Sequence, residues 1–111
     1  MGICNGFQIL TEAGLLPGGL LHNASTKFIC KNVNLKAVTQ NSLVTSKINP
    51  NAVLKIPIAH GEGNFYAHAD ELKKLYEHDQ VLFKYCDEHG NITAEANPNG
   101  SLDNIAGVCN V

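Results

Sequence analysis

A cysteine lies between two glycines at the start of this chain, in the segment Gly2-Ile3-Cys4-Asn5-Gly6. This spacing is typical of the cysteine form of the nucleophile elbow, a sharp turn from a strand into a helix that holds the nucleophile exposed. The glycines allow the tight bend, and the helix directs its free N–H groups at a developing anion. A cysteine held in this way attacks carbonyl carbons and forms thioester intermediates.

A working elbow needs more than its cysteine. A free thiol is only a few per cent ionised at neutral pH, so Cys4 needs a helix N-terminus, a neighbouring imidazole or both. The backbone N–H of Asn5 is predicted to be one oxyanion donor, because it belongs to the residue after the nucleophile. The second donor of such a site comes from a loop after an earlier strand, and only three residues precede Cys4.

Composition is that of an ordinary globular domain. The 111 residues are 44% hydrophobic and 16% charged, with a net charge of -2, which favours one folded domain over 1–111 and argues against disorder. This charge gives no reason to expect nucleic acid or a membrane surface as a partner. No apolar run is long enough to span a bilayer and Met1 begins no secretory leader, so the cytoplasm is the expected location.

The four cysteines are widely spaced and form no Cys-x-x-Cys pair, so no metal site is expected. Without a secretory leader, free thiols are expected rather than disulfides. Cys30 and Cys86 lie in apolar, strand-like runs and are predicted to be small buried hydrophobes.

Hydrophobic periodicity predicts the elements that position the cysteine. Helices are expected over 6–13 and 69–78, the second burying Leu72, Leu75 and Tyr76. Strands are expected over 26–38, 53–59 and 80–86, with a last one from 105. The alternation changes sense near Asn32, which predicts a bulge or twist, and Pro57 is expected to lie in an edge strand or at the end of a strand.

Three long blocks carry a family resemblance. The segment 2–18 resembles the elbow of the class I glutamine amidotransferases that serve as glutaminase subunits of phosphoribosylformylglycinamidine synthases. The segment 57–66 (PIAHGEGNFY) and the segment 97–101 (NPNGS), followed by Ile105-Ala106-Gly107, are similar to two further signatures of these subunits, in the same order. Because the blocks span nearly the whole chain, the resemblance is far more specific than a lone elbow motif.

The resemblance implies an α/β domain of the flavodoxin-like, three-layer type with a central parallel sheet. It implies that Cys4 attacks the side-chain amide of glutamine and that Gln8 helps to hold this substrate. The ammonia would pass to a large synthetase subunit, where ATP and magnesium belong, to make the amidine of formylglycinamide ribonucleotide in purine synthesis. His60, Glu62, Asn97 and Ser101 are implied to lie in loops that border the pocket or meet the partner.

The resemblance also implies missing parts. The family's N-terminal strands and its later His-Pro-Glu strand, which supplies the general base, are absent from this sequence. The expectation is therefore a partial domain that is inactive alone, a part completed by another chain, or a non-catalytic remnant that binds the synthetase. His60 could replace the missing base, although a loop that shapes the site is the simpler interpretation, and the other four histidines are expected to be solvated.

Overall fold

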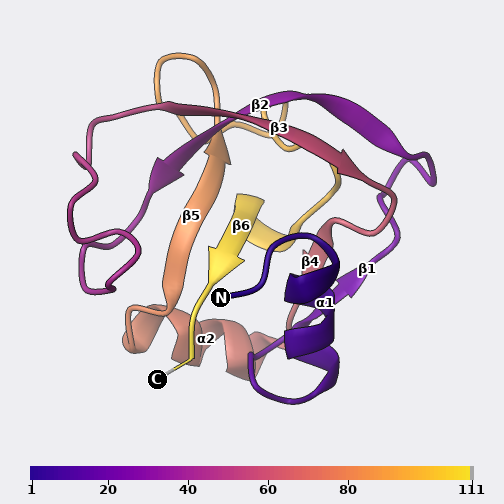
Figure 1. The fold of residues 1–111 in the computed structure, drawn as a ribbon, viewed down its shortest axis with the longest axis horizontal. Coiled ribbons are helices and arrows are strands. Elements are labelled where there is room, and N and C mark those ends of the chain that lie inside the picture. The colour runs from indigo at the N-terminus through magenta and orange to yellow at the C-terminus, as the bar shows by residue number, and fades with distance from the viewer. Residues whose placement is uncertain (111) are drawn as a thin grey trace.

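The structure is a computed structural model that describes residues 1–110. Its elements, in chain order, are α1 (Asn5–Glu12), β1 (Gly19–Leu21), β2 (Ile29–Ala37), β3 (Leu54–His60), β4 (Asn64–Tyr66), α2 (Ala69–Glu77), β5 (Val81–Cys86), a short 3-10 helix (Leu102–Asn104) and β6 (Ile105–Val108). Figure 1 shows α1 and α2 below the long β2–β3 ribbon. Strands β5 and β6 lie between this ribbon and α2. Both expected helices and the strands expected over 26–38, 53–59, 80–86 and from 105 are present.

The main sheet is antiparallel. Its strand order is β3-β2-β5-β6 and every neighbouring pair is antiparallel, while β1 and β4 form a separate antiparallel pair. The mixed α/β character is confirmed, but the expected parallel sheet is wrong for residues 1–110. Parallel neighbours need a crossover, usually through a helix, and α2 instead links β4 to β5, which lie in different sheets.

The outer ribbon of the sheet is regular. The β2–β3 register runs without a break from Ile29 opposite His60 to Leu35 opposite Leu54, so the bulge expected near Asn32 is absent. The change in alternation reflects burial: residues 30–32 are exposed on both faces, and only Val33 and Ala37 of this strand are buried. The edge position expected from Pro57 is confirmed, because β3 ends the sheet.

Helix α2 buries a narrower stripe than expected. Leu75 is 1% exposed, but Tyr76 is 40% exposed. The Tyr76 hydroxyl donates a hydrogen bond to Asp103, and Lys84 Nζ lies 4.9 Å from the Tyr76 ring centroid. Burial, helped by the hydrogen bond and charge of Asp103, raises the pKa of Tyr76 above its usual range. Tyr76 therefore joins α2 to the segment before β6 instead of filling the core.

The core joins α1 to the rest of the molecule. Its buried members are Phe65, Ala67, Leu75, Val81, Ile105 and Val108. Phe7 of α1 packs against Phe65 of β4, with ring centroids 6.1 Å apart. The Phe65 ring also lies against Gly18, which has a φ of +83° and where a Cβ would come within 2.6 Å of the ring. The β1–β4 pair was not expected from the sequence, because three-residue strands carry no readable alternation.

The exposure of the two cysteines in the sheet, Cys30 and Cys86, depends on which strands lie beside them. Cys86 is 2% exposed, as expected, whereas Cys30 is exposed, so its predicted burial is wrong. Cys30 lies in the part of β2 that pairs only with the edge strand β3, beyond the cover of the core. All four cysteines are free thiols. Neither helix within residues 1–110 has the length and apolar run needed to cross a bilayer.

Candidate functional site

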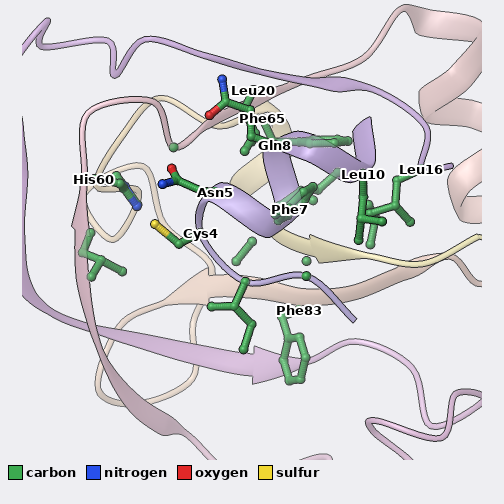
Figure 2. A pocket seen from close by; sticks show the side chains of 18 of the residues that line it. Cys4, Asn5, Phe7, Gln8, Leu10, Leu16, Leu20, His60, Phe65 and Phe83 are labelled. Carbon is green, nitrogen blue, oxygen red and sulfur yellow. The ribbon is translucent and has the colours of Figure 1, made fainter. Parts of the chain in front are cut away.

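A large cavity opens between the elbow and the sheet. It has a volume of about 1000 Å³, and its mostly apolar lining includes residues 1–5, the inner face of α1, parts of β3, β5 and β6, and the loop 61–63. Figure 2 shows Cys4, Asn5 and His60 at one end of this space, with Phe7 and Leu10 farther along it. This volume is at the upper end of the range for small-molecule sites. The cavity is therefore larger than a single bound amino acid requires.

Cys4 occupies the bend before α1. It is the N-cap residue of the helix, with φ 59° and ψ -118°, and it is exposed. A positive φ at a residue other than glycine costs free energy and is found at functional sites more often than elsewhere. The sharp bend expected at Cys4 is therefore present, although residues 1–3 form no strand here.

The two glycines of the elbow differ in what they do. A Cβ at Gly2 would lie 2.5 Å from the Gly6 carbonyl group and 2.7 Å from Leu10 Cδ1, whereas a Cβ at Gly6 would meet nothing within 4 Å. Neither glycine has a positive φ. Gly2 therefore provides room, and the strained dihedral angle belongs to Cys4 itself.

The first turn of α1 leaves the Asn5 N–H free. Gly6 N donates to Ile3 O at 3.0 Å and Gln8 N donates to Cys4 O at 3.2 Å. The Asn5 N–H has no acceptor among residues 1–110, as is usual for the first donors of a helix. Its position agrees with the oxyanion role expected for it, which stays a prediction.

Gln8 reaches across the cavity mouth to Glu62. Its Nε2 donates to Glu62 Oε2 at 2.9 Å and, more weakly, to Glu12 Oε1 at 3.4 Å. His22 Nδ1 lies 4.0 Å from the other carboxylate oxygen of Glu62. These contacts bring two predicted site residues together and leave Oε1 of Gln8 as the atom free for a ligand, a role that remains a prediction.

His60 is the only histidine among residues 1–110 that lines the cavity. Its Nε2 lies 3.2 Å from Nδ2 of Asn99. Burial lowers the pKa of the His60 imidazole below its usual value, which favours the neutral form of the ring. The structure thus brings His60 to the Cys4 cavity, but with one ring nitrogen already engaged.

Asn97 and Ser101 shape a loop and do not line the cavity. Asn97 Oδ1 accepts hydrogen bonds from Gly100 N at 2.8 Å and Asn99 N at 3.2 Å. Ser101 Oγ accepts from Phe65 N at 3.1 Å and lies 2.9 Å from Gly63 O. Any contact they make with a partner stays a prediction.

Two buried asparagines were not predicted as site residues. Asn99 and Asn23 are each 1% exposed. Asn23 Nδ2 donates to His60 O at 2.9 Å, and its Oδ1 accepts from Gly63 N at 2.9 Å. The turn-like sequence around Asn99 was a usable signal, but nothing local marks Asn23. Among residues 1–110, no three His, Cys, Asp or Glu side chains gather as a metal site.

The fold and the elbow define the class of protein. The model of the CobB/CobQ-like glutamine amidotransferase domain matches residues 1–111, and the chain belongs to this family. The family resemblance drawn from the three sequence blocks is confirmed.

Particular relatives are subunits of one synthase. The chain is 56% identical over 110 residues to phosphoribosylformylglycinamidine synthase subunit PurQ of Aquifex aeolicus, covering 99% of this chain and 48% of the relative. It is 53% identical over 110 residues to the same subunit of Methanocaldococcus jannaschii, with the same coverage. The chain thus spans about half the length of the curated relatives it matches.

A solved relative shares the fold. The structure of PurLQS from Thermotoga maritima matches with a TM-score of 0.78 and 40% identity, covering 99% of this chain and 44% of that chain. The antiparallel arrangement described above is therefore similar to part of a larger solved protein.

Proposed function

We propose that this chain carries the nucleophile of a glutaminase, the component of a phosphoribosylformylglycinamidine synthase that releases ammonia from glutamine. One observation carries the proposal: an exposed Cys4 at φ 59° caps a helix and faces a cavity, in a chain that matches an amidotransferase family along its whole length. A structural cysteine needs neither the strained angle nor the exposure.

The reaction assigns a task to each residue at the bend. The Cys4 thiolate attacks the side-chain carbonyl carbon of glutamine, and the Asn5 N–H stabilises the resulting oxyanion. The general base, which has taken the proton of the Cys4 thiol, gives it to the amide nitrogen as the C–N bond breaks, and ammonia leaves. Water then cleaves the thioester to give glutamate and the free Cys4 thiol. Gln8 holds the substrate through its free Oε1.

The general base belongs to the His-Pro-Glu segment that the family resemblance implies, and this sequence does not contain it. Removing members of a catalytic triad lowers the rate by several orders of magnitude. The 111-residue chain alone is therefore expected to form a covalent adduct with a reactive substrate analogue but not to turn over glutamine.

The ammonia would be used by a partner. The relatives are named as subunits of the synthase, and the solved relative comes from a structure of PurLQS. We infer that this chain supplies ammonia to a large synthetase subunit in the cytoplasm. That subunit would hold ATP and magnesium and convert formylglycinamide ribonucleotide to the amidine in purine biosynthesis.

Labelling with a glutamine chloroketone tests the glutaminase assignment. Cys4 and Cys30 are both exposed free thiols, so Cys30 is a built-in control for simple accessibility. Mass spectrometry should find one label, abolished in Cys4→Ser, retained in Cys30→Ser and slowed by excess glutamine. Equal labelling of both cysteines, or labelling that glutamine does not slow, would contradict a glutamine site at Cys4.

The size of the cavity favours a second role for the chain, as one part of a split enzyme. Its apolar lining includes Ile3, which is 75% exposed, and Met1, which is 97% exposed. The polypeptide suited to cover it is the remaining length that the relatives possess. Co-expression with the missing portion of a relative should restore glutaminase activity. Co-purification with the large synthetase subunit without any activity would instead indicate a non-catalytic binding role.

A further inference from the structure

A buried polar cluster holds one wall of the Cys4 cavity. We define the Asn99 cluster as Asn99, Ser101, Tyr85 and His60. Asn99 Oδ1 accepts from Ser101 N at 3.1 Å and from Ser101 Oγ at 2.7 Å. Its Nδ2 lies 3.1 Å from the Tyr85 hydroxyl and 3.2 Å from His60 Nε2. Every polar atom of the Asn99 side chain therefore has a partner within the protein.

The partners of Asn99 determine which way its amide points. The backbone N–H of Ser101 can only donate, so the Asn99 atom facing it must be the acceptor oxygen. The amide nitrogen then faces His60, and this nitrogen can also only donate. His60 Nε2 must therefore accept, which puts the imidazole proton on Nδ1.

The imidazole is also held in place sterically. Its ring lies against Gly63, where a Cβ would overlap Nε2 and the two neighbouring ring carbons. Asn23 bonds to both the His60 carbonyl and the Gly63 N–H, which fixes the turn beneath the ring. The ring is consequently fixed in orientation as well as in protonation.

The other ring nitrogen is available to the cavity. His60 Nδ1 has no hydrogen-bond partner among residues 1–110, and His60 and Cys4 line the same cavity (Figure 2). A proton on this nitrogen makes His60 a donor to a bound group. The same proton leaves no lone pair on Nδ1 with which His60 could accept a proton from the Cys4 thiol.

We propose that Asn99 is a positioning residue that holds His60 as the neutral Nδ1–H imidazole, so that His60 donates a hydrogen bond to an oxygen of the bound glutamine and does not act as the base. The identity of the bound group rests on the proposed glutaminase function. The assignment of the imidazole proton to Nδ1 does not depend on that function.

Nitrogen NMR of the chain labelled with ¹⁵N-histidine tests the proposal directly at pH 7.5. His60 should give an Nδ1 signal of the protonated type and an Nε2 signal of the unprotonated type. An Nε2–H imidazole, or an exchanging mixture of both forms, would overturn the proposal without any variant being made.

Two variants test the role of Asn99. In Asn99→Asp the side chain can only accept, so the His60 proton should move to Nε2 or the ring should become charged. Asn51→Asp makes the same charge change at an exposed loop residue and should leave the His60 signals unchanged. Unchanged signals in Asn99→Asp would also overturn the proposal.

Chloroketone labelling of Cys4 separates this proposal from the proposed function. His60→Asn keeps a donor near the Nδ1 position and should retain the labelling rate, whereas His60→Gln should lower it about fivefold to tenfold, the value of one hydrogen bond. Equal rates in the two variants would contradict the donor role. If His60 shows the expected proton but glutamine does not protect Cys4, the glutaminase function fails and the Asn99 positioning stands.

Discussion

The two walls of the Cys4 cavity are built differently. The His60 wall is tied together by Asn99 and Asn23, each 1% exposed, and by Ser101 at 3%. The elbow wall ends in an exposed segment, with Ile3 75% exposed, and α1 is joined to the core mainly through Phe7 and Phe65. The His60 wall is thus organised by the chain itself, while the wall that carries Cys4 depends on few contacts.

Phe65→Ala should have the largest effect, because it removes the buried side chain through which α1 of the elbow wall packs on the core. Phe65 is 1% exposed and packs against Phe7, so truncation should lower the free energy of unfolding by about 3–5 kcal/mol. Urea denaturation measures it, with Phe28→Ala as the control. Phe28 is 69% exposed, and its truncation should change stability by about 0.5 kcal/mol or less. Similar losses in both variants would argue against the packing described.

Asn99→Leu should have the next largest effect on stability, and this substitution affects the His60 wall alone. It leaves the buried Ser101 N–H and Tyr85 hydroxyl without their partner, which should cost about 2–4 kcal/mol. The measurement is again urea denaturation, with exposed Asn51→Leu as the matched control. A loss no greater than that of the control would show that the Asn99 cluster does not stabilise this wall.

Gly2→Ala should distort the elbow wall. The added methyl group meets the Gly6 carbonyl and Leu10, and such overpacking typically costs about 1–3 kcal/mol. The rate of Cys4 labelling should fall, because the bend must open to make room. Gly6→Ala is the control, since a methyl group there meets nothing within 4 Å. If Gly6→Ala slows labelling as much as Gly2→Ala, the steric account of Gly2 is wrong.

A pH dependence from His60 should be the smallest effect. Burial lowers its pKa in the folded chain, so the unfolded chain takes up a proton first as the pH falls below about 6.5. The contribution to stability is complete above that pH and is lost as the pH falls toward the lower, folded value. The ionisable groups around His60 include Glu62, two residues along the chain, Tyr85, which bonds to the same Asn99 side chain, and Cys4, which lines the same cavity.

Urea denaturation midpoints at pH 7.5 and 5.5 measure this change of stability with pH, which we call the pH slope. His60→Gln should flatten it, while His89→Gln, which changes an exposed histidine, should not. Asp87, whose pKa is lowered chiefly by the backbone N–H of Asn91, contributes only below about pH 4, outside this range. A slope that survives in His60→Gln would assign the dependence to another group.

Local signals in the sequence predicted local structure well. Helix α2 is marked by Asp70 and Glu71 in its first turn and by apolar spacing, and it begins at Ala69, where it was expected. Strand β5 is marked by its apolar run and begins within one residue of its expected position. The spacing of Gly2, Cys4 and Gly6 predicts the bend at Cys4. It does not predict which of the two glycines provides the room for the bend.

The errors share a physical cause, because they concern partners distant in the sequence. The direction of the sheet depends on which strands meet, and Cys30 is exposed because its half of β2 has only an edge strand beside it. The contact between Asn99 and His60 joins residues 39 positions apart. Apolar periodicity carries no information about such pairings, so the Asn99 cluster was visible only once the chain was folded.

Pro57 determines how the sheet can grow. It lies in the middle of the edge strand β3, opposite Asn32, and a proline offers no N–H to an incoming strand. Polymerisation through this margin would therefore be interrupted at its centre. The opposite margin, β6, contains no such block, so any additional strand recruited by the sheet would join there, next to the β6 residues that line the cavity.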